Sequence, residues 1–577
     1  MKNKHNKGLI TNSDMLKKKA ENSFRKKIRT TFTDSGFQYI RSDNIHFNVG
    51  HRKVELDYIF IYENVILICE DTCGKNDPKK HIRNKNEAAK EINNNKEEFF
   101  MRLKENFPDK ISLLSQYSIE RYLLFYLYFP MFDVGLTDDD EALFDLLTVV
   151  DSNNLSYFYR MSQCINYSAK YEIFRFLKIR SEDLGNLTSE GSKTSIKAPI
   201  IYPKDTTGLR NNVRIVSFMM SAEKLLKTSY VLRKDNWEES IYLYQRLLEK
   251  EKVKSIRTFL ANKGEAFFNN IIVALPDNIS FEDANGNAIP KGKIQDFQNC
   301  KLIIPDEMNS ICVIDGQHRI FAHYEAAESD KTEKRISVLR KQLHLLVTGL
   351  IFPDEMKEAE RIQLQSEIFL DINNNSKKVA ANVLTHIEMI KDPFSDIGLA
   401  RRVIEKLNKK NVFLNRFELS AIDENKIKVA SIIKYALKYL VSINPADDRE
   451  SMFNFWNGNK ELFEKKDMGE LDNYLEFCAK SINMYFSAIK NAFSQEWNDP
   501  KSKILSVVSI NGFIIALNRM LPKYGLKDFA FYSDHFHKLS IDFSKENFRY
   551  TSSQYRMFSS QLLKEGFEFT DADLISF

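Results

Sequence analysis

The chain has 577 residues, of which 43% are hydrophobic and 28% are charged, and its formal net charge is +5. This composition is typical of a globular protein with ample core material and excludes a disordered or fibrous chain. No stretch approaches the apolar length of a membrane span, and a net charge this small does not by itself indicate a polyanionic partner.

The charge is unevenly distributed, because residues 1–30 hold ten Lys or Arg residues against two acids. Such a segment is either a nucleic-acid-binding arm or a solvated start of the chain. The six cysteines form no zinc pattern, since Cys69 and Cys73 lie four apart without a second pair. Free thiols and the lack of an apolar secretion signal predict a cytoplasmic protein without a membrane partner.

The N-terminal region alternates helical and strand patterns and ends before a polar segment at residue 180. Hydrophobic residues at helical spacing alternate here with short runs of β-formers, which is typical of an α/β domain. The predicted elements are a helix over 22–36, strands over 45–49, 54–62 and 64–70, a helix from 78 to about 104, a strand over 121–129, a short strand over 146–150 and an aromatic-rich helix over 155–176.

The order helix, three strands, helix, strand is similar to the core of restriction-endonuclease-like nucleases, the PD-(D/E)XK fold. Those enzymes place an acid on the second strand and Glu-x-Lys on the third, and the acids bind a divalent metal. Asp57 and Glu70 occupy the two acidic positions, and Glu55 lies two residues before the first of them. The resemblance therefore implies a nuclease-like site for Mg²⁺ formed by Asp57, Glu70 and Glu55.

The lysine of that pattern is missing, because Thr72 stands at its position. A replacement could come from Lys75, or from Lys85 on the following helix. If neither lysine reaches the acids, the domain is a nuclease-like module that binds DNA or only packs. Both interpretations remain open.

A second module follows a Ser-, Gly- and acid-rich linker over residues 181–209. Its pattern again alternates strands with amphipathic helices, and a basic stripe of Lys250, Lys252, Lys254 and Arg257 marks the longest helix. The predicted elements are strands over 213–219, 270–275, 301–304 and 342–352, a further strand beginning at Ile311, and helices over 221–231, 237–262 and 354–370.

The strand that begins at Ile311 breaks at Asp315-Gly316 and continues into a helical pattern, which is the local arrangement of an anion site. A helix N-terminus leaves backbone N–H groups unpaired, and glycine lets a ligand approach the backbone. Arg319 adds a fork that matches phosphate oxygens, and His318 can donate, accept or titrate. The alternative is a strand–helix corner with Asp315 as the helix cap.

A second polar segment, Asp371–Lys378, is predicted as a loop between two helices. Asn side chains cap helices and bind phosphates or sugar hydroxyls, and Lys377 is expected at the start of the next helix, where anions are favoured. The alternative is an ordinary helix–helix turn.

The run Asp315-Gly316-Gln317-His318-Arg319 resembles the signature of DGQHR-domain proteins. This group includes the DndB-type proteins of DNA phosphorothioate modification systems and relatives in other bacterial DNA-modification and phage-defence loci. The flanking segments Tyr244–Arg246 and Phe369–Asn373 occur in the expected order. The resemblance covers about residues 210 to 440, and some members carry an N-terminal nuclease-like module with Glu-x-Thr, as at Thr72.

The group is related to the ParB/sulfiredoxin superfamily, in which a turn at a helix start holds nucleotide phosphates. The resemblance therefore implies a nucleoside triphosphate, possible hydrolysis and Mg²⁺, with Asp315, His318 and Arg319 as catalytic residues. The nucleotide-binding residues that it implies are Gly316, Gln317, Gln245, Arg246, Asn373 and Lys377.

The C-terminal third is predicted as mainly helical, with helices over 383–389, 397–408, 427–441, 471–493 and 504–521. The basic residues Arg401, Arg402, Lys406, Lys409 and Lys410 form either a DNA-facing helix or a solvated face.

These elements predict an α/β (α+β) multidomain protein. The expected parts are a basic arm over 1–30, a restriction-endonuclease-like domain over 31–180, a linker over 181–209, a ParB/sulfiredoxin-like DGQHR domain over 210–395 and a helical region over 396–577.

Three functions fit this organisation. The first is a DNA-associated, nucleotide-binding protein of a modification or defence system, with or without hydrolysis of the NTP. The second is a DNA-binding transcriptional regulator or scaffold without turnover, and the third is a metal-dependent DNA nuclease gated by nucleotide. Expected partners are DNA, other subunits of the same system and a second copy of the chain.

Overall fold

The computed structural model of the chain consists of two compact units, residues 1–239 with 247–361, and residues 240–246 with 362–577. None of the described helices is both long and apolar enough to cross a membrane. The described residues are 12–43, 45–74, 78–132, 134–136, 144–185, 193–203, 212–233, 245, 247–266, 269–374, 381–419, 423, 426–445, 450–551 and 553–575.

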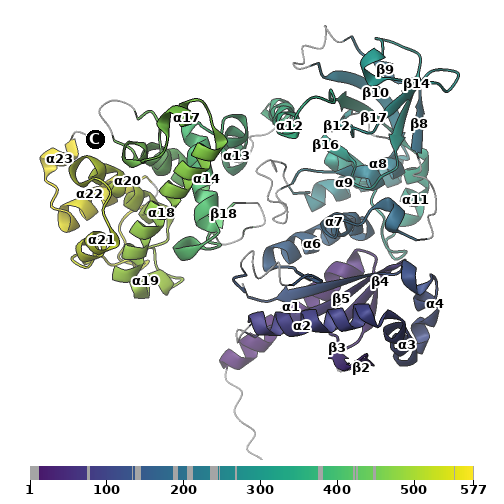
Figure 1. The fold of residues 1–577 in the computed structure, drawn as a ribbon, viewed down its shortest axis with the longest axis horizontal. Coiled ribbons are helices and arrows are strands. Elements are labelled where there is room, and N and C mark those ends of the chain that lie inside the picture. The colour runs from purple at the N-terminus through teal and green to yellow at the C-terminus, as the bar shows by residue number, and fades with distance from the viewer. Residues whose placement is uncertain are drawn as a thin grey trace, which may run out of the picture. The chain divides into compact units, whose positions relative to one another are not determined.

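The first unit begins with helix α1 and a five-stranded sheet (Figure 1). The first three strands of the order are antiparallel, and the last two run parallel to the third. The elements are α1 (Asn12–Asp34), then in sheet order β1 (Gln38–Arg41), β4 (Tyr58–Tyr62), β5 (Val65–Thr72), β6 (Leu123–Pro130) and β7 (Leu147–Val149), with α2 (Pro78–Asn94), α3 (Lys96–Asn106), α4 (Ile111–Leu114), α6 (Ser152–Ile165) and α7 (Lys170–Phe176).

Side-chain alternation along the central strands gives the sheet two buried faces. Ile66 and Ile68 of β5 pack with Ile82 of α2, whereas Phe60 of β4 contacts Phe32 of α1. Because successive strand residues point to opposite faces, every even-numbered residue of β5 lies toward α2.

The structure has helices and strands in the predicted segments, but the predicted helices over 78–104 and 155–176 are each divided in two, and the strands before β5 differ from the prediction. The predicted strand over 54–62 is two strands, and its first half pairs with β2 (His46–Val49) as β3 (Arg52–Glu55) in a separate hairpin. The first strand of the main sheet is instead β1, which the prediction missed. Its four residues begin two positions after Gly36, whose φ is +89°, and bury little besides Ile40, so they show no hydrophobic run.

The same unit holds two further sheets. The six-stranded sheet has the order β11 (Ser229–Tyr230), β16 (Ile311–Asp315), β12 (Ile271–Ala274), β17 (His344–Ile351), β10 (Arg214–Ser221) and β9 (Ile200–Ile201). The four-stranded sheet has the order β14 (Ala288–Ile289), β13 (Ser280–Glu282), β15 (Lys301–Pro305) and β8 (Lys193–Lys197). The associated helices are α8 (Ala222–Thr228), α9 (Lys250–Lys263), α10 (Gln317–Phe321) and α11 (Glu333–Gln342).

Three predictions for this region differ from the structure. The segment predicted as a linker carries β8 and β9, which pair with β15 and β10. The helix after the DGQHR turn has only five residues and ends at Ala322. The predicted loop at Asp371 begins inside α12 (Glu358–Asn374), because Asp371–Asn374 continue the helical backbone.

The second unit is helical around one large aromatic and aliphatic core. Its basic helix is held by ion pairs to α18, since Arg402 pairs with Asp472 and Lys410 with Glu476, and Arg401 is fully buried. The elements are α13 (Ala381–Lys391), α14 (Asp396–Asn408), β18 (Phe417–Glu418), β19 (Ile427–Lys428), α15 (Val429–Ile432), α16 (Lys438–Leu440), α17 (Lys460–Glu464), α18 (Met468–Ala492), α19 (Ser494–Asn498), α20 (Val507–Tyr524), α21 (Phe529–Phe536), α22 (Tyr555–Gly566) and α23 (Asp571–Ile575).

A buried charged contact joins the two α/β halves of the first unit. The guanidinium of Arg233, fully buried, contacts the Glu172 carboxylate of α7 and donates to the Tyr157 hydroxyl of α6 at 3.2 Å and to Gln317 Oε1 at 3.2 Å. Helix α6 packs against α1 and β6 on one side and α9 on the other (Figure 1).

Replacing Arg233 by methionine is expected to destabilise the first unit by about 3–5 kcal/mol, because Glu172 is left charged and buried without its partner. The double variant Arg233→Met with Glu172→Met is expected to regain most of that loss, since an apolar pair removes the uncompensated charge. Chemical denaturation of both variants measures the free energies of unfolding. An unchanged stability of the single variant would contradict the role assigned to this ion pair.

Candidate functional site

The acidic residues predicted for the N-terminal domain lie together on the face of the sheet that α2 covers. The side chain of Glu70 lies on the same face of β5 as those of Ile66 and Ile68, and Asp57 directly precedes β4. The two carboxyl groups are within hydrogen-bonding reach of each other. Glu70 is 4% exposed, so the acids meet at a nearly dry end of the sheet.

Lys85 supplies the cation that the strand itself lacks. Its Nζ lies 2.6 Å from Glu70 Oε2 and donates to the main-chain oxygen of Glu55 at 3.1 Å. Lys85 belongs to α2, which packs directly over this face, so the helix brings the ammonium group to Glu70. The side chain of Glu55 is exposed at the end of its hairpin, and Lys75 lies outside the described residues.

Burial shields the carboxyl groups of Asp57 and Glu70 from water, and this shifts their pKa values. Burial raises the pKa of the Glu70 carboxyl well above its usual value, and the Lys85 ammonium opposes this shift. Burial also raises the pKa of Asp57, whose Oδ2 accepts from the backbone N–H of Asp71 at 2.8 Å. One lysine faces two carboxyls, so a bound cation would relieve the remaining cost of ionising both.

Polar aromatic and imidazole groups complete this cluster. His81 Nδ1 lies 2.7 Å from the Tyr128 hydroxyl, and burial lowers the pKa of His81. Burial raises the pKa of Tyr128 to about 12. Neither residue was predicted from the sequence, although His81 lies one helical turn before Lys85 on the same face of α2.

Asp71 follows Glu70 but points to the opposite face of the sheet. Its carboxylate accepts from Arg25 Nε of α1 at 3.1 Å and from the Tyr58 hydroxyl. This acid therefore anchors α1 and does not join the cluster of Asp57, Glu70 and Lys85.

The described residues contain no group of three or more His, Cys, Asp or Glu side chains arranged to hold a metal ion. Asp57 and Glu70 are two carboxylates, and Mg²⁺ in proteins usually keeps several waters and binds through one or two carboxylates plus substrate phosphate. The donor set thus fits a hard divalent cation completed by water and substrate.

The DGQHR turn forms the second candidate site. Gly316 adopts φ +101° between β16 and α10, and a Cβ there would lie 3.0 Å from Arg319 Nη2 and 3.0 Å from Ile271 Cγ1. Glycine is therefore required both by the left-handed backbone and by the close approach of Arg319. Asp315 does not cap the helix, because Gly316 occupies that position and Asp315 pairs with Arg319 at 2.8 Å.

Around this turn several buried polar atoms remain without a hydrogen-bond partner among the described residues. They are Arg319 Nε, Arg233 Nη2 and Asn270 Oδ1. Arg319 Nη2 donates to the Asn270 main-chain oxygen at 2.7 Å. His318 Nε2 accepts from the backbone N–H of Glu249 at 3.2 Å, which connects the turn to the start of α9.

The remaining predicted nucleotide residues belong to the other unit or are not described. Gln245 is buried in the second unit, and Asn373 lies in the last turn of α12. Arg246 and Lys377 lie outside the described residues. The binding roles predicted for these four residues stay predictions.

Comparison with known proteins adds one finding. Residues 206–550, more than half of the chain, match the family described as "DndB: DNA-sulfur modification-associated". The chain belongs to the DndB family. Membership associates this DndB-family protein with DNA-sulfur modification, and the match begins after the domain that holds Asp57 and Glu70. No curated protein and no solved structure gave a significant match to the chain.

If Asp57 and Glu70 hold Mg²⁺, its addition is expected to raise the Tm of the first unit by about 2 °C or more, because a cation that binds the folded state alone stabilises that state. Carboxyls with a raised pKa favour folding while protonated and oppose it as the pH rises through the folded-state value, so the Mg²⁺ effect should grow with pH. Thermal unfolding at several pH values measures this effect, and an equal response in Asp57→Asn would contradict the assignment.

Proposed function

We propose that the protein acts on DNA within a DNA-sulfur modification system and that its N-terminal domain is a metal-dependent phosphodiesterase of the restriction-endonuclease-like fold. The observation that carries the proposal is the position of Lys85, whose Nζ lies 2.6 Å from Glu70 beside Asp57. Two acids and a lysine on one face of the sheet could bind a metal ion and stabilise the charge that develops during phosphodiester hydrolysis.

Each residue has a distinct part in this proposal. Asp57 and Glu70 would hold Mg²⁺, which supplies charge stabilisation at the scissile phosphate. Lys85 would orient the attacking water and stabilise negative charge as the new P–O bond forms and one P–O ester bond breaks. The leaving oxygen would receive a proton, for which the hydrogen-bonded pair of His81 and Tyr128 is the candidate donor.

The topology supports the same proposal. A helix, three antiparallel strands, a helix and a fourth strand parallel to the third place the acids and Lys85 at one end of the sheet. The order matches the predicted core even though its first strand is β1 and not the hairpin.

Contact with DNA is supported by a distorted helix in the second unit. Residues Ile433–Leu437 form a π-helical turn, and Tyr435 and Tyr439 are each 43% exposed. Lys434 Nζ lies 5.4 Å from the Tyr435 ring and Lys438 Nζ 4.7 Å from the Tyr439 ring. Exposed aromatic rings with adjacent lysines suit stacking of bases and pairing with phosphates.

A second function, nucleotide binding at the DGQHR turn, rests on the unpartnered arginine nitrogens there. Buried N–H groups of Arg319 and Arg233 without a partner among the described residues suit an anionic ligand. Asp315 already neutralises part of the Arg319 charge, so a phosphate would have to share or displace that ion pair.

With Mg²⁺ present, plasmid DNA is expected to be cleaved by the wild-type chain and at least about 100-fold more slowly by Asp57→Asn and Glu70→Gln. Lys85→Met is expected to cost about 100-fold while leaving Mg²⁺ binding in place. Glu87→Gln and Lys90→Met are matched controls, because both side chains lie at the surface of α2. Equal cleavage by wild type and Glu70→Gln would exclude this function.

At the DGQHR turn, Arg319→Ala is expected to weaken binding of nucleoside triphosphates about tenfold or more, because a charge-assisted contact is lost. Arg335→Ala removes an exposed arginine of the neighbouring helix and serves as the control. Equilibrium titration with fluorescent ATP and GTP analogues measures both variants. A wild-type chain that binds neither nucleotide would contradict the second function.

A further inference from the structure

A second polar pocket lies where α6 ends and α9 begins, away from Asp57 and Glu70. It encloses about 260 Å³ and is lined by Gln163, Cys164 and Asn166 from the end of α6, by Lys250 and Lys254 from the first turns of α9, and by the rim of the 324–332 segment. Neither the DGQHR turn nor the acid–lysine cluster contributes a lining residue.

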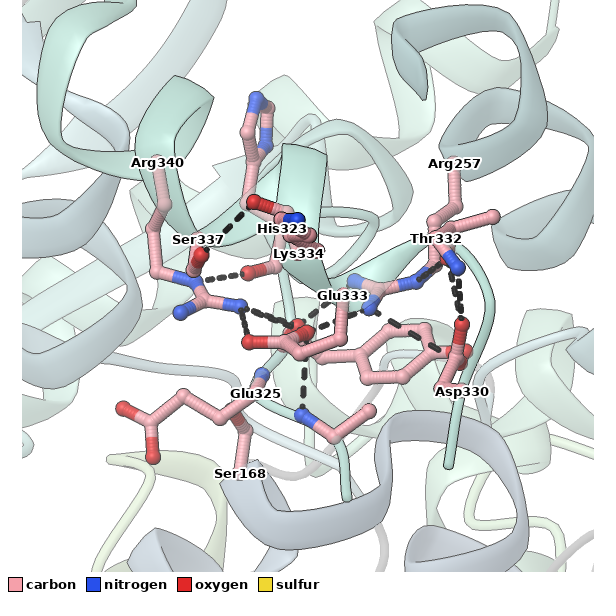
Figure 2. A network of polar contacts seen from close by, with 12 residues as sticks. Ser168, Arg257, His323, Glu325, Asp330, Thr332, Glu333, Lys334, Ser337 and Arg340 are labelled. Atoms are coloured by element: carbon pink, nitrogen blue, oxygen red, sulfur yellow. Dashed lines mark hydrogen bonds and ion pairs between the residues drawn. The ribbon is translucent and has the colours of Figure 1, made fainter. Parts of the chain in front are cut away.

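The floor of this pocket is an electrically balanced network (Figure 2). Arg257 contacts Glu333 at 2.6 Å and donates to the Tyr324 main-chain oxygen at 2.6 Å, and Arg340 contacts the same Glu333 at 2.8 Å. Asp330 lies 3.9 Å from Arg257 and completes a set of two cations and two anions. Arg257 is therefore fully engaged and fixes the pocket's shape.

The positive charges of the two lysines that line the pocket are not neutralised by ion pairs as the charge of Arg257 is. Lys250 and Lys254 lie one helical turn apart on α9, both are exposed, and neither forms an ion pair with a described acid. Among the charged side chains that line the pocket, Lys250, Lys254 and Arg257 are cations and Asp330 is the acid. The pocket thus carries an excess of positive charge.

The backbone adds to that charge. The start of the 14-residue α9 holds Glu249 at the cap position and Glu251 in the first turn beside Lys250, so the excess of positive charge comes from the pocket lining and not from the first turn alone. The unpaired N–H groups of a helix start add a partial positive charge. Asn166, at φ +46° and ψ −127°, holds a strained backbone in the opposite wall.

We propose that this pocket is an anion site that binds the phosphate of a nucleotide, either a free nucleoside monophosphate or the terminal phosphate of a DNA strand. Lys250 and Lys254 would pair with the phosphate oxygens, and the Asn166 amide would meet the sugar, whereas the Gln163 amide already donates to Asp34 at 2.7 Å. The volume is smaller than the roughly 300–1,000 Å³ of most small-molecule sites, so it suits a phosphate with part of its nucleoside.

The site also has a direct mechanical connection to the DGQHR turn. Glu249, the residue before α9, donates its backbone N–H to His318 Nε2, and the Cys164 thiol lies 3.7 Å from the main-chain oxygen of Leu248. A phosphate held at the start of α9 would therefore fix Leu248 and Glu249, which contact α6 and the DGQHR turn respectively. This role is independent of phosphodiester cleavage at Asp57 and Glu70.

The test compares two double variants of the full chain with equal net charge. Lys250→Gln with Lys254→Gln removes the proposed ligands, and Lys252→Gln with Lys263→Gln removes two exposed lysines of the same helix that do not line the pocket. The probes are dAMP and a short oligonucleotide with a 5′-phosphate or a 5′-hydroxyl. Calorimetric titration is expected to show at least about tenfold weaker phosphate-dependent binding in the first variant alone.

Alkylation of cysteine locates the bound probe. Cys164 and Cys73 are the two cysteines that are not buried, and only Cys164 lines the pocket. The bound phosphate is expected to slow alkylation of Cys164 and not of Cys73, and to do so equally in Asp57→Asn and Arg319→Ala. Protection by dAMP indicates a free nucleotide, and protection by the 5′-phosphorylated strand alone indicates a DNA end.

Two results would overturn the site. One is equal affinity of the two double variants for every probe, and the other is protection of Cys164 that vanishes in Arg319→Ala. Loss of DNA cleavage in Asp57→Asn with phosphate binding retained would leave the pocket standing, so the two proposals fail separately.

Discussion

The contact between Lys85 and Glu70 is the constraint on which the N-terminal domain depends. Two carboxyls at the end of a sheet are buried by α2, and burial raises the pKa of both. Helix α2 excludes water from the two carboxyls and also carries Lys85. The same helix therefore causes the desolvation and supplies the compensating positive charge. A domain built only for stability would place apolar residues here, because a buried pair of acids with one lysine costs free energy.

The chain uses arginines to connect this domain to the DndB-family region. Arg233 joins α6 and α7 to Gln317 of the DGQHR turn, and Arg257 with Arg340 holds the segment after that turn against α9. These guanidinium groups are buried and planar, so each bonds several elements at once. A ligand at the turn or at the start of α9 therefore acts on the same helices that pack against the sheet of Asp57 and Glu70.

The resemblance to the PD-(D/E)XK core singled out Asp57 and Glu70 in the sequence, and the missing lysine at Thr72 could be noticed there too. Lys85 was only one of two alternatives, because its reach depends on how α2 docks on the sheet. The short strand β1 was missed since four residues with little burial carry no periodic signal. Arg233 was missed for a different reason: it meets Gln317 only through the tertiary fold, 84 residues away in sequence.

Crystals of the full chain soaked in Mn²⁺ test the central claim most directly, because anomalous scattering locates the cation without an activity assay. The account predicts an anomalous peak about 2.2 Å from carboxylate oxygens of both Asp57 and Glu70, with Lys85 moved from Glu70 toward a bound water. A map without a peak at these acids, with Lys85 still paired to Glu70, would contradict it.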